Sequence, residues 1–213
     1  MHTFFDASSV AYGAVVFLRN VESKRVTLVA SKAKVAPVQS VCIPRLELMA
    51  ACVGLKLAKE VVKALQLEFD IVTFWGDSLN VLCWIRQQSR KFKPFVANRL
   101  GTIQKHSKGK QWRYVPTKIN PADLVSRGMI AKDCARNQTW WSGPEFLRKE
   151  ESNWPKVPHQ IHDDIYKDNE WRGKATLLTV ETEFPNLESS NSNVLAPENY
   201  SDLSKLLRVH SLV

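Results

Sequence analysis

A glutamate stands in the middle of the apolar face of the longest helix that the sequence predicts. Apolar residues recur every three or four positions from Pro44 to about Leu65, which is typical of an amphipathic helix. At about 100° per residue, Glu47 falls on this face, and the lysines fall on the opposite one. An acid directed at a core is costly unless something positive meets it. Interaction with the helix dipole, with Arg45 nearby, explains the position of Glu47 along the helix but not its direction.

The segments around this helix predict an α/β fold. Three β-rich runs precede it and predict an antiparallel meander: residues 3–6, 10–19 and 25–31. Further strands and helices are predicted after it, at residues 70–77, 78–87, 94–106, 111–117 and 120–129. The run 70–77 is almost continuously apolar and ends in Gly-Asp, as expected for a strand buried on both faces. This order implies a mixed five-stranded sheet with helices on its faces.

Charge is distributed unevenly along the 213 residues. Residues 1–133 hold 21 Lys+Arg and 9 Asp+Glu, a net charge of +12, and residues 134–213 hold 9 and 12, a net charge of −3. A basic first part favours a polyanionic partner for that part alone. The sequence shows neither a secretory signal nor a run approaching the roughly 18–20 apolar residues of a membrane helix. We therefore expect neither a secreted nor a membrane protein.

The change of character after residue 133 predicts three segments. We expect a compact α/β domain at 1–133 and a Trp- and Pro-rich connecting segment at 134–180. Residues 181–213 are expected to form a flexible linker and the start of a further region, because residues 181–200 are polar, acidic and rich in Ser and Asn.

Three aspartates lie at comparable places on other elements. Asp6 ends the first strand and Asp77 ends the run 70–77, and open α/β sheets tend to place ligands at the carboxyl ends of their strands. Asp123 is the third residue of the helix that Asn120 and Pro121 open. Each has a structural alternative: Asp6 can start a turn, Asp77 can cap the next helix, and Asp123 can cap its own.

Taken together, the four acids predict a metal site. Four of the nine acids of a basic segment would meet above the sheet. Carboxylate clusters repel one another when empty and become favourable around hard divalent cations such as Mg²⁺ or Mn²⁺. Two such ions activate a water and stabilise the leaving oxygen in phosphodiester cleavage. A basic surface around an acidic metal centre suits a polyanionic substrate.

Five stretches of sequence carry a more specific signal: FFDASSVAYGAVVFLR, VASKAKVAPVQSVCIPRLELMAA, FWGDSLNVLCWI, FKPFVANRLGTIQ and WRYVPTKINPADLVSRG. In this order they resemble the ribonuclease H domain in the polyproteins of BEL/Pao-type LTR retrotransposons, from residue 2 to about residue 130. WWSGPEFL (140–147) and SDLSKLLRV (201–209) resemble the segments that lead from this domain toward the integrase.

This resemblance implies a ribonuclease H fold and hydrolysis of the RNA strand of RNA–DNA hybrids during reverse transcription. Asp6, Glu47, Asp77 and Asp123 match the catalytic carboxylates of the family, which hold two Mg²⁺ (or Mn²⁺) ions. Asp6 would bridge both ions, and Asp77 would hold the ion near the nucleophilic water. The implied partners are the hybrid and the reverse transcriptase and integrase parts of the same polyprotein, with no membrane and an open oligomeric state. The implied location is intracellular, in a cytoplasmic virus-like particle or in the nucleus.

Polar and basic positions around the carboxylates are candidates for contacts with nucleic acid: Ser8, Gly13, Ser78, Arg86, Arg90, Lys91, Lys93, Asn120 and Arg127. A tight hairpin explains Ser8 and Gly13 equally well.

Two departures from the family keep an alternative open. Many relatives carry a mobile histidine in the loop before the last aspartate, and here residues 116–120 contain none. Leu79 stands where a polar residue that contacts the hybrid is often found. The alternative is a catalytically inactive or repurposed nucleic-acid-binding fragment. A strand-transfer enzyme of the same fold is a third hypothesis, and the spacing of the acids argues against it.

Overall fold

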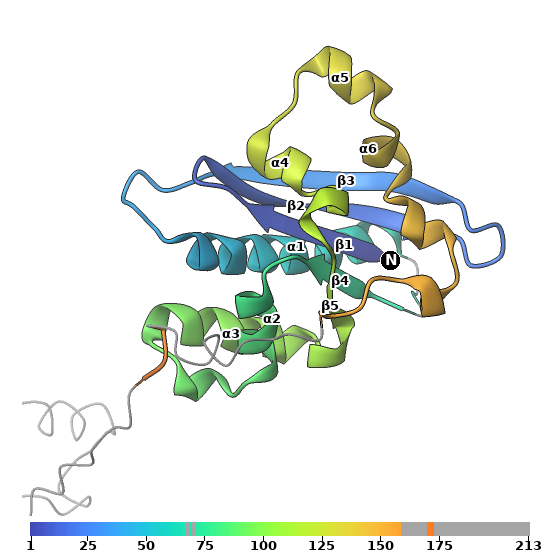
Figure 1. Cartoon of the computed structure of the whole chain (residues 1–213). Helices are drawn as coiled ribbons and strands as arrows, with labels where there is room; N and C mark the ends of the chain where they lie inside the picture. Colours follow the sequence, from blue (N-terminus) through green and yellow to red (C-terminus); the bar gives the residue numbers. More distant parts are fainter. Residues whose placement is uncertain (67–68, 70, 159–169, 173–213) are drawn as a thin grey trace, which may run out of the picture. The chain divides into compact units, whose positions relative to one another are not determined.

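Alternating apolar side chains fold the first part of the chain into an antiparallel meander. The computed structural model of the protein describes residues 1–66, 69, 71–158 and 170–172. Its first three strands pair in sequence order (Figure 1): β1 (His2–Ala7), β2 (Ala11–Arg19) and β3 (Val26–Val35). Phe4 and Phe5 point to opposite faces of the sheet, because successive side chains alternate, and both are buried. The expected three-strand meander is confirmed.

Two parallel strands extend this meander on the side of β1. They are β4 (Thr73–Gly76) and β5 (Trp112–Tyr114), and the strand order is β3-β2-β1-β4-β5. β4 runs parallel to both of its neighbours, with Phe4 opposite Trp75 and Phe74 opposite Trp112. The carboxyl ends of β1 and β4 therefore meet at the same edge of the sheet. The expected mixed five-stranded sheet is confirmed.

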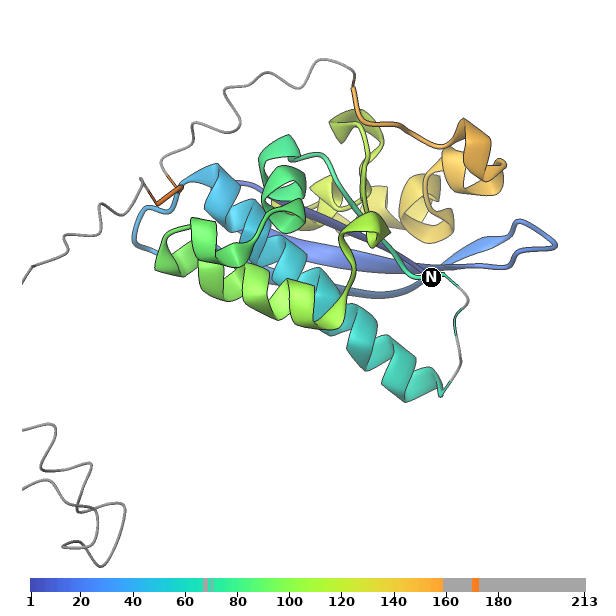
Figure 2. The ribbon, with the colours of Figure 1, turned by 90° about the horizontal axis from the view of Figure 1, so that it is seen from below.

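Three helices cover one face of the sheet. They are α1 (Ile43–Leu65), α2 (Leu79–Arg86) and α3 (Pro94–His106), and α3 lies beside α1 (Figure 2). Pro44 stands in the first turn of α1, and Gln66 ends the helix with a left-handed φ of 51°. The predicted apolar stripe, including Leu46, Val53 and Leu57, packs against Phe5 and its neighbours in this core.

The opposite face is covered by shorter elements. These are α4 (Asp123–Arg127) and α6 (Gln138–Ser142), whereas α5 (Ala131–Arg136), which lies between them in the chain, projects away from the sheet (Figure 1). Single 3₁₀ turns connect and follow the helices and strands: η1 (Ser89–Lys91), η2 (Gly109–Gln111), η3 (Thr117–Ile119), η4 (Glu145–Arg148) and η5 (Glu151–Asn153). The helix expected over residues 120–129 is shorter than predicted, because Gly128 ends it with a φ of 80°.

Residues 143–154 complete the core on this second face. Phe146, Leu147 and Trp154 pack with Phe4 and Trp75, and the rings of Trp75 and Trp154 lie 5.7 Å apart. The boundary expected after residue 133 therefore does not coincide with the end of the core. The three-part division of the chain stays a prediction, and residues 181–213 lie outside the described residues. None of the described helices is long and apolar enough to cross a membrane.

Trp154→Ala tests whether this segment belongs to the folded domain. Removing a ring that is 5% exposed is expected to lower the free energy of unfolding by about 3–5 kcal/mol in urea titration. Trp141→Ala is the matched control, because Trp141 is 51% exposed, and we expect it to cost less than about 1 kcal/mol. Equal small losses in the two variants would show that the segment contributes nothing to the core.

Candidate active site

The parallel pairing of β1 and β4 brings two aspartates together. Phe4 lies opposite Trp75, so Asp6 and Asp77, each two residues further on, follow at the same edge of the sheet. Neighbouring strands lie about 5 Å apart, so the negative charges of the two carboxylates repel each other.

Neither aspartate is used to cap a helix or close a turn. Ser78 is the N-cap of α2, and its Oγ accepts a hydrogen bond from a backbone N–H of the helix. Ser8 closes the turn after β1 by accepting from the backbone N–H of Val10 at 3.1 Å. The structural roles that could have explained Asp6 and Asp77 are therefore filled by adjacent serines.

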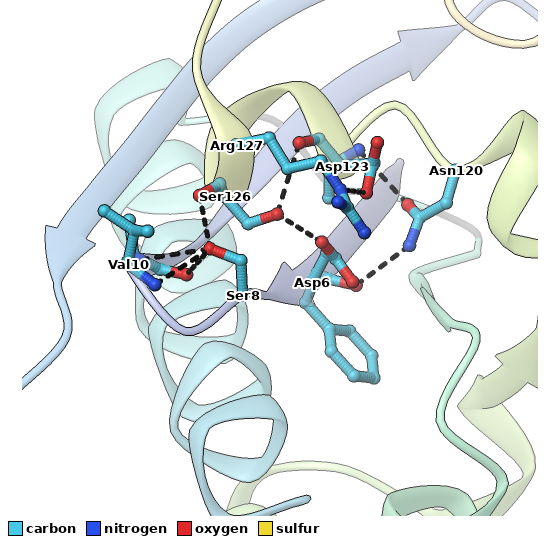
Figure 3. A network of polar contacts seen from close by, with 10 residues as sticks. Asp6, Ser8, Val10, Asn120, Asp123, Ser126 and Arg127 are labelled. Carbon is cyan, nitrogen blue, oxygen red and sulfur yellow. Dashed lines mark hydrogen bonds and ion pairs between the residues drawn. The ribbon is translucent and has the colours of Figure 1, made fainter. Parts of the chain in front are cut away.

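Asp6 lies at the centre of a hydrogen-bond network between β1 and α4 (Figure 3). The Ser126 hydroxyl donates to the Asp6 carboxylate, and Asn120 Nδ2 donates to the Phe5 carbonyl oxygen at 3.2 Å. Burial raises the pKa of Asp6 to about 6. The hydrogen bond from Ser126 lowers this pKa, and the negative charges of Asp77 and Asp123 raise it further.

Glu47 joins this group from the helix side. It is partly buried, as its place on the apolar face predicts, and burial raises its pKa to about 7. A hydrogen bond from Ser78 opposes this rise in pKa, and the charges of Asp77 and Asp6 add to it. The Arg45 guanidinium, in the same turn of the helix, is bound by Glu170.

Asp77 and Asp123 complete the set of four. Burial raises the pKa of Asp77, a hydrogen bond from Thr117 lowers it, and the charge of Asp123 raises it. Asp123 Oδ1 accepts from Arg127 Nε at 2.6 Å, an i,i+4 ion pair on α4. Four carboxylates from four different elements thus act on one another at one edge of the sheet.

The four carboxylates do not adopt a metal-binding arrangement in this structure. No three His, Cys, Asp or Glu residues within the described parts of the chain are arranged to hold an ion. Each carboxylate is instead engaged by a donor of the protein: Asp6 by Ser126, Glu47 by Ser78, Asp77 by Thr117 and Asp123 by Arg127. The chemistry of the donor set nevertheless fits Mg²⁺ or Mn²⁺, because one buried and three partly buried carboxylates offer oxygen ligands and excess negative charge.

The candidate nucleic-acid contacts fall into two groups. Ser8, Ser78, Asn120 and Arg127 all lie in the network around the carboxylates. Arg86 is the last residue of α2, Arg90, Lys91 and Lys93 lie on the connection from α2 to α3, and all four are exposed. Their contacts with nucleic acid stay predictions.

Gly13 lies where the strands and α4 pack closely. It is buried, and an added Cβ would lie 2.3 Å from the Lys32 carbonyl oxygen and 2.6 Å from Val125 Cγ1. Glycine is therefore needed here for close packing between β2, β3 and α4, and contact of Gly13 with nucleic acid stays a prediction.

Two residues of the site were not predicted from the sequence. Ser126 donates to Asp6, and Thr117 donates to Asp77. The available signal for Ser126 was its spacing of three residues from Asp123, which places both on one side of a helical turn. Thr117 lies in the 3₁₀ turn η3 and had no comparable signal.

Part of the chain is similar to a known protein family. Residues 1–78 match the Pao retrotransposon-like RNaseH-like domain. The match confirms the predicted resemblance over β1, β2, β3, α1 and β4, and it includes Asp6, Glu47 and Asp77. The fold is accordingly ribonuclease H-like, with a mixed sheet and flanking helices.

A crystal structure of RNase H1 from the halophilic archaeon Halobacterium salinarum NRC-1 is similar to 59% of this chain and 93% of its own, with 20% identity and a TM-score of 0.42. A search of curated proteins finds no match.

The raised pKa values predict how stability depends on pH. Asp6 and Glu47 bind protons more tightly in the folded state than in the unfolded state. Below about pH 4 both groups make their full contribution to the free energy of unfolding. This contribution is lost as the pH rises through about 6 for Asp6 and about 7 for Glu47. Glu47→Gln is expected to remove part of this loss and to raise the stability of the metal-free protein at pH 8 by roughly 1–3 kcal/mol.

The control for this measurement is Glu60→Gln on the exposed face of the same helix. Urea unfolding of both variants and the wild type at pH 5 and pH 8, without metal, gives the comparison. Glu60→Gln is expected to follow the wild type. A Glu47→Gln protein with the wild-type dependence on pH would contradict the assignment of a buried, repelled carboxylate at residue 47.

Proposed function

We propose that the protein is a metal-dependent ribonuclease H that hydrolyses the RNA strand of RNA–DNA hybrids. The observation that carries the proposal is the gathering of Asp6, Glu47, Asp77 and Asp123, from four elements, at one edge of a ribonuclease H-like sheet. Such a concentration of negative charge is unfavourable for folding alone, since burial and mutual repulsion raise the pKa values of three of the four.

The four carboxylates would hold the metal. Asp6 and Asp77 each interact with the other three acids, which suits them to the central positions. When bound, two Mg²⁺ or Mn²⁺ ions would supply the activation of water and the stabilisation of the leaving oxygen.

The protein's own side chains prepare the site: they orient the carboxylates, and two of the carboxylates bind protons. The Ser126 and Ser78 hydroxyls fix the Asp6 and Glu47 carboxylates, and Asn120 fixes the end of β1 through the Phe5 carbonyl. With pKa values of about 6 and 7, Asp6 and Glu47 must lose their protons before they can act as ligands. Arg127 must also release Asp123, since the two are paired.

The proposed substrate and partners are supported by the basic charge and by the resemblance to the Pao retrotransposon-like domain. The basic connection between α2 and α3 provides cations for phosphates, and the 2′-hydroxyls in a wide minor groove would distinguish RNA from DNA. The hybrid would arise during reverse transcription, with the reverse transcriptase and integrase parts of one polyprotein as partners. The proposed location is intracellular, in a cytoplasmic virus-like particle or in the nucleus.

A second candidate function is hybrid binding without cleavage. Two observations favour it: Asp123 is held by Arg127, and the described carboxylates do not lie in metal-binding positions. In that case binding would depend on salt and would not depend on the carboxylates.

Cleavage of a labelled RNA–DNA hybrid in Mg²⁺ separates the two candidates. The wild type is expected to cut the RNA strand, and Asp77→Asn is expected to reduce the rate by about 10²–10³-fold or more, because it removes a metal ligand. Asp133→Asn, at an exposed position on α5, is the control and is expected to cut at the wild-type rate.

Two outcomes would reject the nuclease. One is a folded wild type that cuts no hybrid in Mg²⁺ or Mn²⁺, and the other is full activity of Asp77→Asn. Tight, salt-dependent hybrid binding that Asp77→Asn leaves unchanged, in the absence of any cutting, would establish the binding module instead.

A further inference from the structure

The first turn of α1 lacks the groups that usually stabilise the start of a helix. Cys42 is the N-cap, and within the described residues its side chain makes no hydrogen bond to the helix; the first turn also contains no acid. Helix starts carry partial positive charge on unpaired N–H groups, which caps or acids normally satisfy. Glu47 is the fifth residue of this helix, so disorder in the first turn would reach one of the four carboxylates.

A residue far along the chain neutralises the positive charge of Arg45 in this first turn. Glu170 binds the guanidinium of Arg45, in the first turn, with Nε–Oε1 and Nη2–Oε2 distances of 2.6 and 3.1 Å. Such a bidentate pair fixes orientation as well as charge. Glu170 is 5% exposed, and the Arg45 guanidinium also lies 4.8 Å from the ring centre of Phe95 on α3.

Glu170 is itself held firmly against the domain. Residues 170–172 run antiparallel to residues 91–93, joined by two backbone hydrogen bonds of 2.8 Å. Between them, the rings of Phe92 and Trp171 lie 4.8 Å apart, and Phe92 is fully buried. The backbone that carries the Glu170 carboxylate is therefore fixed by its pairing with residues 91–93.

We propose that Glu170 is a positioning residue of the candidate active site. Through Arg45 it holds the first turn of α1, and thereby holds Glu47 where it can bind metal. This role rests on the proposed function, and it extends the functional unit to residue 172, well past the residues 1–78 that match the family.

The effect is expected to be local. Removing one partner of an ion pair is costly when the other charge stays buried, but the Arg45 side chain is 34% exposed and can be solvated by water after Glu170 is neutralised. The long apolar stripe of α1 holds the rest of the helix independently. Loss of Glu170 should therefore loosen the first turn without unfolding the domain.

Glu170→Gln in the full chain tests this role, because it keeps the shape of the side chain and removes its charge. In the metal-free protein, amide hydrogen exchange of residues 43–48 is expected to quicken about three- to tenfold, the effect of one partly buried charge at a helix start. Calorimetric titration with Mg²⁺ is expected to show an affinity lowered by a similar factor. Exchange in the rest of α1 and the midpoint of urea unfolding should change little.

Glu151→Gln is the matched control, because Glu151 pairs with an arginine, Arg113, outside this helix. It is expected to change neither the exchange of residues 43–48 nor Mg²⁺ affinity. The proposal is overturned if Glu170→Gln behaves like this control, or if its exchange quickens uniformly along α1. A wild type that binds Mg²⁺ but cuts no hybrid would contradict the proposed function alone, and the exchange and titration would still decide the role of Glu170.

Discussion

The repulsion between carboxylates at the shared edge of β1 and β4 is the constraint on which the rest of the structure depends. The parallel register fixes Asp6 beside Asp77, and the directions of α1 and α4 bring Glu47 and Asp123 to them. Stability alone would favour a structure in which these four negative charges lie farther apart. Here hydroxyl donors and partial protonation make them tolerable, and a cation would do so more completely.

Holding like charges together requires rigid support on both faces of the sheet. One core is built from α1, α2 and α3, and the other depends on residues that follow the family-like segment, including Phe146 and Trp154. The backbone pairing of residues 170–172 adds a third support, next to the first turn of α1. The domain that can hold the site is therefore longer than the part that carries its carboxylates.

Much of this could be predicted from the sequence, because local periodicity reports burial. The alternation in β1 and β2 and the 3.6-residue period of α1 gave the sheet, the helix and the inward direction of Glu47. Contacts between distant residues leave no such local pattern. Ser126 meets Asp6 across 120 residues and Glu170 meets Arg45 across 125, and neither pair could be predicted. Residues 143–154 were not predicted to pack, since 3₁₀ turns and isolated aromatic anchors have no sustained period.

The most direct test of the account is diffraction from crystals of the full chain soaked in Mn²⁺, with data collected at the manganese absorption edge. The account predicts anomalous peaks within ligand distance of Asp6, with Glu47, Asp77 and Asp123 completing the coordination, and Asp123 no longer paired with Arg127. It also predicts that these peaks disappear in Asp6→Asn. Wild-type crystals with no manganese at these carboxylates, or with manganese bound elsewhere, would contradict the claim that the four acids are gathered for metal.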